Sequence, residues 1–140
     1  MPLSIEIVTP EQRVLTMECD EVRLPGVEGG FGIRPGHTPL VAALAAGELV
    51  IVNLVSSAGG GSEQRYAVGE GFAEVSNDKV RVLVEEAVRA EQIDPHRAAT
   101  ELKELQARLA SMSPDDPSFE IERAHVERAA ARALVAGARP

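Results

Sequence analysis

The hydrophobic pattern of this chain changes its period once, near residue 88, and that change limits the fold more than any other feature. Before it, apolar and polar residues alternate, as in "LSIEIV" at 3–8 and "KVRVLVEE" at 79–86. Alternation puts every second side chain on one face, which is typical of half-buried strands. After it, glycine is absent until Gly137 and alanine is frequent, so the apolar residues recur with a helical period. We therefore expect a β part followed by an α part.

Further strands are indicated by "ELVIVNLV" at 48–55, "QRYAVG" at 64–69 and "GFAEVS" at 71–76. Turn-forming residues separate them, including the pair Asn77 and Asp78. Seven or more short strands at this spacing are typical of a β-sandwich or a barrel. A chain of 140 residues has room for one compact domain of roughly 85 residues and a small appendage.

Two Asp-Pro pairs mark the expected helix starts. An aspartate can accept hydrogen bonds from the free N–H groups of a first turn, and proline is tolerated at the first helical position. Asp94 with Pro95 therefore predicts a helix over about 95–110. The pair at 116–117 predicts a second helix over about 117–135, which stops at Gly137.

The apolar residues of the two predicted helices are few and mostly small. The stripe of the first helix consists of Ala98, Leu102, Leu105 and Leu109. The apolar side of the second is expected to consist of Val126, Ala130, Ala133 and Leu134. Because small alanines permit close approach, we expect the helices to pair as a hairpin. Its limited apolar surface predicts marginal stability, so the hairpin could dock, undock or extend.

Composition argues against several classes of function. The formal net charge of -8 and the pI near 4.9 argue against a nucleic-acid binder, which needs a basic surface. The single cysteine, Cys19, cannot form an internal disulfide, and no Cys/His cluster has the spacing of a zinc site, so we expect no metal. No stretch reaches the roughly 18 uncharged apolar residues of a membrane helix, so we expect no direct membrane insertion.

The stretch "LPGVEGGFGIRPGHTPL" at 24–40 is the first candidate for a functional segment. Its glycines lack the spacing of a phosphate-binding loop, and strands rather than a helix are expected after it. Its Pro-Gly pairs are typical of tight turns. His37 could act as a general base, but the sequence nominates no nucleophile. We therefore expect no catalytic residues and keep a small β-sandwich enzyme or ligand-binding module using His37 as the alternative.

The second candidate is "IDPHRA" at 93–98, where the first predicted helix begins. Asp94 would cap the helix, and the guanidinium of Arg97 could bind a phosphate. The second predicted helix adds positive charge through Arg123, Arg128 and Arg132. The alternative is ordinary capping with solvated helix faces, and spacing alone does not separate the two.

Together these segments resemble the epsilon subunit of bacterial F-type ATP synthase. The resemblance runs through "IEIVTPE", "DEVRLPGVEGGFGIRPGHTPL", "YAVGEGFAEVSNDKVRVLVEEA" and "IDPHRA", in this order and at the family's spacing. It covers nearly all of residues 3–98 and extends more loosely into the tail. It implies an α+β fold, with an N-terminal antiparallel β-sandwich over residues 1–88 and a C-terminal two-helix antiparallel hairpin over residues 89–140.

The resemblance implies a non-catalytic rotor subunit that joins the gamma subunit to the c-ring and couples proton flow to ATP synthesis. Such a subunit works at the cytoplasmic face of the bacterial plasma membrane and requires no cofactor. The stretch facing the c-ring would be Glu28, Gly29 and Gly30, and the stretch near gamma would be Pro35, Gly36 and His37. Many relatives carry an acidic residue where this chain has Gly30, so Glu28 or the backbone would have to contact the ring.

In that family the hairpin folds against the sandwich or extends along gamma toward the alpha and beta subunits, where it inhibits ATP hydrolysis. Some members bind ATP at the folded hairpin, and a ligand that binds one state stabilises it. The resemblance makes ATP a candidate regulatory ligand. Its candidate binding residues are Ile93, Asp94, Arg97 and Ala98, with Arg123, Arg128 and Arg132 as contributors.

Overall fold

The computed structural model describes residues 2–54 and 61–137. Its strands are β1 (Leu3–Val8), β2 (Arg13–Cys19), β3 (Glu21–Gly26), β4 (Gly29–Ile33), β5 (Leu40–Leu44), β6 (Gly47–Asn53), β7 (Ser62–Val68), β8 (Gly71–Ser76), β9 (Lys79–Val84) and β10 (Ala87–Arg89). A short 3-10 turn, η1 (Ala90–Gln92), precedes the helices α1 (Pro95–Ala110) and α2 (Phe119–Gly137). The expected α+β fold is therefore confirmed, and β10 spans the domain boundary expected at residue 88.

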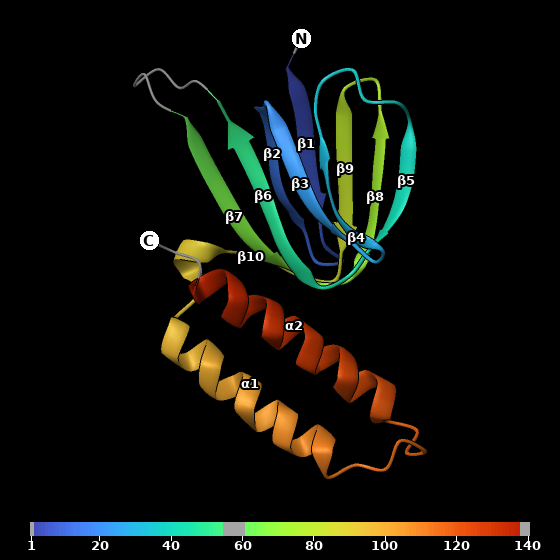
Figure 1. The fold of residues 1–140 in the computed structure, drawn as a ribbon, viewed down its shortest axis with the longest axis vertical. Coiled ribbons are helices and arrows are strands. Elements are labelled where there is room, and N and C mark those ends of the chain that lie inside the picture. The colour runs from blue at the N-terminus through green and yellow to red at the C-terminus, as the bar shows by residue number, and fades with distance from the viewer. Residues whose placement is uncertain (1, 55–60, 138–140) are drawn as a thin grey trace.

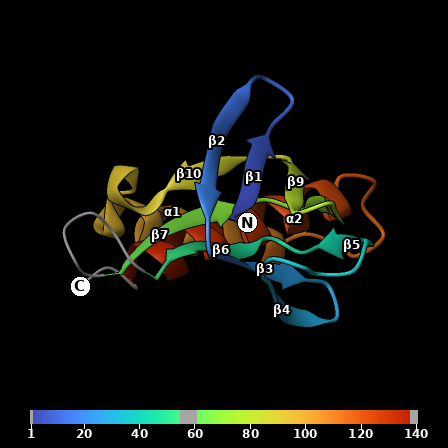
Figure 2. The same cartoon turned by 90° about the horizontal axis from the view of Figure 1, so that it is seen from above.

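The strands form two layers that are continuous with each other. One layer has the order β10-β7-β6-β3, with β4 also paired to β3, and the other has the order β5-β8-β9-β1-β2. The layers are connected through the pair of Gly26 in β3 and Leu44 in β5, where the sheet folds over. Seen from above, β6 and β3 lie in one layer and β1 and β9 in the other (Figure 2).

Alternation along the strands builds the core between the layers. In β1 the side chains of Leu3, Ile5 and Ile7 are fully buried, and in β9 Val80 and Val82 are buried in the same way. The residues between them are more exposed. The period-two pattern of the sequence therefore predicts the buried face of these strands correctly.

The pairing of β1 with β9 departs from the expected antiparallel sandwich. These two strands run parallel, from Ser4 opposite Lys79 to Val8 opposite Leu83, whereas the other described pairs are antiparallel. Alternation specifies which side chains face the core but not the direction of a distant partner strand, because both kinds of ladder satisfy the same buried face.

Turn chemistry acts as predicted between β8 and β9. Asn77 and Asp78 adopt φ values of 51° and 60°, the left-handed conformation that a two-residue hairpin turn requires. Asn and Asp tolerate this conformation better than most residues, so the pair both ends β8 and fixes the register of β9.

The two helices begin at Asp-Pro pairs, but in different ways. Oδ1 of Asp94 accepts from the N–H groups of His96 and Arg97 at 3.0 and 3.1 Å, so α1 begins at Pro95 as expected. After Asp116 the chain first makes a four-residue turn over 116–119, in which the N–H of Phe119 donates to the Asp116 carbonyl oxygen at 2.9 Å. Helix α2 therefore begins at Phe119, two residues later than predicted.

Helix α2 lies between the sandwich and α1 (Figure 1) and packs against β6 and β7. A second apolar cluster holds it there, formed by Ala67, Ala90, Ile93, Ala98, Ala131, Val135 and Ala136. The predicted apolar side of α2 is only half right: Val126 and Ala133 are partly buried, and Ala133 packs against this cluster, but Ala130 is exposed and Leu134 is 61% exposed. Alanines occur on every side of this helix, so apolar spacing does not identify the face that docks.

We predict that Gly71→Ala strongly destabilises the sandwich. A Cβ at this position would overlap the carbonyl oxygen of Leu83 and lie 2.8 Å from the Cα of Val84, both in the backbone of β9. Overpacking typically costs about 1–3 kcal/mol of unfolding free energy, and we expect the upper end because a paired strand cannot move aside. Urea unfolding followed by circular dichroism measures the loss.

Gly30→Ala is the matched control for that variant. The nearest atom to its Cβ would be the Leu24 carbonyl oxygen at 3.6 Å, which is ordinary van der Waals contact. Equal losses of stability in the two variants would contradict the packing argument.

Candidate functional site

Within the stretch at 24–40, the residues expected to face the c-ring lie at the tip of the β3–β4 hairpin. Val27 and Glu28 form its turn, and Gly29 follows with a φ of +127°. A Cβ on Gly26 would meet the carbonyl oxygen of Gly29 at 2.6 Å, so the base of this turn requires glycine. Residues 27–30 are all exposed. The tip therefore presents one apolar and one acidic side chain beside bare backbone.

The residues expected near gamma, Pro35 to His37, lie in the connection between β4 and β5. Gly36 adopts a φ of +86°, and its N–H donates to Oδ1 of Asp78 at 2.7 Å. Because Asp78 belongs to the β8–β9 turn, this hydrogen bond ties the connection to the opposite layer. Nδ1 of His37 lies 2.7 Å from the carbonyl oxygen of Thr38, so the main chain orients the ring.

These two stretches meet in one groove of about 650 Å³ between the hairpin tip and β5. Glu28, Gly29 and His37 all line it. The remaining predicted residues, Gly30, Pro35 and Gly36, line neighbouring hollows instead. Residues expected to face two different partners are therefore close neighbours in the fold.

An outer apolar row continues from this groove across four strands. Cross-strand pairing places Ala43 beside Phe72, Phe72 beside Leu83, and Leu83 beside Val8. Phe72 is 56% exposed, and Val41, two residues before Ala43 on the same face, is 72% exposed. The next row on this face is charged, since Glu6 pairs there with Arg81 at 3.2 Å. A large exposed aromatic side chain on an otherwise paired strand is typical of an interaction surface.

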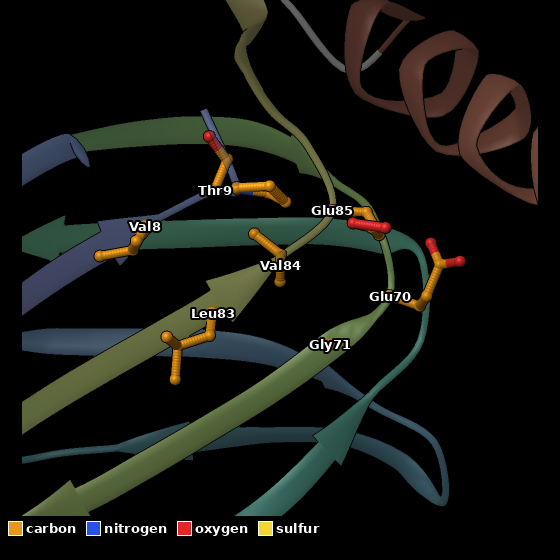
Figure 3. Close-up of a pocket in the computed structure, with 8 residues that line it drawn as sticks. Val8, Thr9, Glu70, Gly71, Leu83, Val84 and Glu85 are labelled. Carbon is orange, nitrogen blue, oxygen red and sulfur yellow. The ribbon is translucent and has the colours of Figure 1, made fainter. Parts of the chain in front are cut away.

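Sequence reasoning did not find the outer apolar row, because its members come from distant segments. A local signal was present in "GFAEVS", where Phe72 occupies the exposed side of a strand whose other side carries Ala73 and Val75. The row ends at a second pocket of about 510 Å³. Figure 3 shows Val8 and Leu83 along its strands, with Glu70 and Glu85 on adjoining turns at its rim.

The four candidate binding residues within the "IDPHRA" motif have different surroundings. Ile93 and Ala98 are buried in the second apolar cluster, and Asp94 caps α1. Arg97 is exposed, and its Nε lies 3.3 Å from Oε1 of Glu101 on the same helix. Three of the four therefore have a structural role in this conformation.

The three arginines of α2 do not converge on one point. Arg123 pairs within its own helix, with Glu120 and Glu127, both at 2.7 Å. Arg128 and Arg132 instead cross to the sandwich, where their partners are Glu70 and Glu86. The link to the motif runs through Glu101, because Nη2 of Arg132 lies 4.0 Å from its Oε2.

The two crossing ion pairs are well aligned. Arg128 binds Glu70 through both carboxylate oxygens, with Nε–Oε1 at 3.0 Å and Nη2–Oε2 at 3.1 Å. Nη1 of Arg132 lies 2.6 Å from Oε2 of Glu86. We call these two contacts the arginine clasps. Bidentate arginine–carboxylate pairs are among the stronger polar contacts in proteins.

Neither the thiol of Cys19 nor the His, Asp and Glu side chains of the described residues indicate a nucleophile or a metal site. Burial, with the charge of Asp20, raises the pKa of the Cys19 thiol to about 11, so it stays protonated at neutral pH. Within residues 2–54 and 61–137, His, Cys, Asp and Glu side chains nowhere gather in threes as a metal site requires. No helix in the described part of the chain is long and apolar enough to cross a bilayer.

Residues 2–90 match the family described as "ATP synthase, Delta/Epsilon chain, beta-sandwich domain". The chain is 47% identical over 137 residues to a protein named ATP synthase epsilon chain from Anaeromyxobacter sp. (strain K), covering 98% of this chain and 99% of the relative. It is 43% identical over 130 residues to the protein of the same name from Myxococcus xanthus (strain DK1622), covering 93% and 91%.

Two solved structures share the fold. A chain from the Euglena gracilis mitochondrial ATP synthase aligns with a TM-score of 0.76 at 24% identity, covering 99% of this chain and 82% of that one. A chain from the Tetrahymena thermophila mitochondrial ATP synthase central stalk and c-ring aligns with a TM-score of 0.57 at 13% identity, covering 99% and 96%. The alignments extend over the hairpin as well as the sandwich.

We predict that the carboxyl group of Glu70 titrates below its ordinary pKa of 4.5. Hydrogen bonds from Arg128 lower this pKa, and the charges of Arg128 and His125 add to the effect, while partial burial opposes it. Because the docked-state pKa is lowered, the ion pair stabilises docking fully above about pH 4.5 and is lost as pH falls through the lowered value. NMR titration of the side-chain carboxyl carbon measures the midpoint.

The test of that cause is Arg128→Gln, which should return the Glu70 midpoint toward 4.5. The other charged groups facing Arg128, Glu85 and Glu86, stay in place. Arg123→Gln is the control, since Arg123 pairs within α2. A midpoint that responds equally to both variants would reject Arg128 as the cause.

Proposed function

The chain belongs to the ATP synthase delta/epsilon family, and from this we propose that its sandwich links the gamma subunit to the c-ring in the rotor of a bacterial enzyme. It is a non-catalytic stalk subunit of the ATP synthase complex. Proton flow would turn the ring, and this chain would turn with it. The alternative of an enzyme or ligand-binding module using His37 is not favoured by this family membership.

The outer apolar row carries the proposal for gamma. A permanent partner needs a rigid surface, and this row lies on four hydrogen-bonded strands rather than on loops. It is continuous with the groove that His37 lines, so Pro35, Gly36 and His37 would form the near edge of the same interface. The charged row beside it would form a polar rim around an apolar centre.

The tip of the β3–β4 hairpin is the proposed contact with the c-ring. It projects Glu28 together with the exposed backbone of Gly29 and Gly30. Glycine at residue 30 offers no acidic side chain, so the contact would depend on Glu28 and on main-chain groups. This arrangement would place the chain at the cytoplasmic face of the plasma membrane through its partners.

The hairpin is the proposed regulatory part. Its apolar attachment to the sandwich consists mostly of alanines, so undocking exposes little apolar surface. Extended along gamma, it would reach the alpha and beta subunits and inhibit ATP hydrolysis. ATP is a proposed regulatory ligand of the docked form, with Ile93, Asp94 and Ala98 shaping the turn and Arg97 exposed to receive a phosphate.

We predict that the full-length chain inhibits ATP hydrolysis when titrated into a cognate alpha-beta-gamma complex that lacks it. Inhibition should saturate near one copy per complex. Phe72→Asp should require at least about tenfold more protein for the same inhibition, because a charge would be buried in the apolar centre of the interface. The hydrolysis rate measures both effects.

Leu54→Asp is the control for the interface variant. Leu54 is 66% exposed, similar to Phe72, but it follows β6 in the other layer. If both variants weaken inhibition equally, the outer apolar row is not the gamma surface. If the unaltered chain does not associate with the complex, the rotor proposal itself is rejected.

We predict that ATP binds the free chain at millimolar concentration and that Arg97→Ala reduces the heat of binding in a calorimetric titration. The exposed guanidinium of Arg97 pairs with the surface carboxylate of Glu101 at 3.3 Å. A phosphate that binds Arg97 therefore has to displace only a weak surface ion pair. Arg89→Ala is the control, because Arg89 pairs with Glu91 at 2.7 Å outside the motif. Absence of binding at millimolar ATP would reject ATP sensing by this chain.

A further inference from the structure

The hairpin is attached to the sandwich by α2, and the attachment is poor in apolar area. Helix α1 packs chiefly on α2. The buried apolar contacts that α2 brings are small, with Ala131, Val135 and Ala136 against Ala67 of β7. Burial of methyl-sized groups gives little free energy for each residue. Some other interaction must therefore decide which face of α2 docks and how firmly.

The arginine clasps supply that interaction. Arg128 and Arg132 are four residues apart, so they leave α2 on one face, one turn apart. Both arginine side chains are about three-quarters covered, with 22% and 23% of their surface exposed. Arg123 lies outside this stripe and stays within its own helix. The face that docks is thus the face that carries the two crossing arginines.

The carboxylates that receive the arginines are held in position by the sandwich. The turn before β8 and the turn after β9 hydrogen-bond to each other: the N–H of Gly69 donates to the Glu86 carbonyl oxygen at 2.9 Å, and the N–H of Glu85 donates to the Glu70 carbonyl oxygen at 3.0 Å. Figure 3 shows Glu70 and Glu85 on these adjoining turns. Glu70 and Glu86 therefore face α2 from a preformed site.

We propose that Glu70 and Glu86 hold the regulatory hairpin docked without a bound nucleotide, by occupying Arg128 and Arg132 as the phosphates of a nucleotide would. The inference rests on the proposed function in taking the hairpin as the regulatory part. Any polyphosphate that engages these arginines has to displace a carboxylate that the fold already places there. Docking is then the resting state of the free chain, and an anion competes with Glu70 and Glu86 for the two arginines.

Glu101 of α1 extends the same arrangement. Its carboxylate lies 3.3 Å from Arg97 and 4.0 Å from Arg132, so Arg132 of α2 is close to one carboxylate of α1 and to Glu86 of the sandwich. An anion entering from the motif would meet this carboxylate first. The carboxylates therefore reduce anion binding as well as holding α2.

The test is hydrogen exchange of the full chain, followed by mass spectrometry, in the double variant Glu70→Gln with Glu86→Gln. Glutamine keeps the size of the side chain and removes its charge. We expect the amides of residues 126–137 to exchange roughly three- to tenfold faster, while those of β1 and β9 stay unchanged. In the unaltered chain, 1 M salt should speed exchange of the same amides, and the double variant should respond much less.

The matched control is Glu18→Gln with Glu74→Gln, two exposed carboxylates on β2 and β8, whereas α2 packs against β6 and β7. It should leave exchange within about twofold of the unaltered chain, as expected when surface charges without a firm partner are removed. If the Glu70 and Glu86 variant also stays within twofold, or if the control rises equally, the clasps do not hold the hairpin and the proposal is overturned.

Mg-ATP and inorganic triphosphate extend the test. Each should slow exchange of residues 126–137 more in the Glu70 and Glu86 variant than in the unaltered chain, because the freed arginines then accept phosphate. A larger effect on the unaltered chain would overturn the competition argument. These readouts use the free chain, so they fail or succeed independently of gamma binding and of the hydrolysis assay.

Discussion

Contact between the β7–β8 and β9–β10 turns sets the position of everything that follows them in the chain. A Cβ on Gly69 would come within 3.2 Å of the Cβ of Glu85 and of the backbone nitrogen of Glu86, so the turns meet this closely because residue 69 has no side chain. Their mutual hydrogen bonds then place Glu70 and Glu86 side by side. Helix α2 docks where those carboxylates are, and α1 follows because it packs on α2.

The two parts of the molecule are held by different forces, and the difference suits different tasks. The sandwich buries continuous rows of Leu, Ile and Val between two layers, which gives a rigid body with a fixed outer surface. The hairpin is held by alanine contacts and by charge pairs that remain partly exposed to solvent and salt. A permanent docking surface and a reversible arm can therefore coexist in one short chain.

Local signals were enough to predict the architecture. The change of period separates strands from helices, Asp94 and Pro95 define the start of α1, and Asn77 with Asp78 defines the β8–β9 turn. Each depends on neighbours within a few residues. The face of α2 that docks was predicted only in part, through Val126 and Ala133, because alanines occur all round the helix and the charged partners of the face are carboxylates far away in sequence. The outer apolar row could not be seen either, since its members become neighbours only after four strands pair in register.

Parallel pairing of β1 with β9 has a consequence for how the chain is made. Strand β1 has its second partner along the sheet only when residues 79–84 have been made and are free to pair with it. Until then β1 has β2 as a partner along one edge, while its other edge has no partner strand. The sandwich thus completes only after β9 has been made, shortly before the helices that dock on it, and a nascent chain that ends before β9 presents an open β edge to its surroundings.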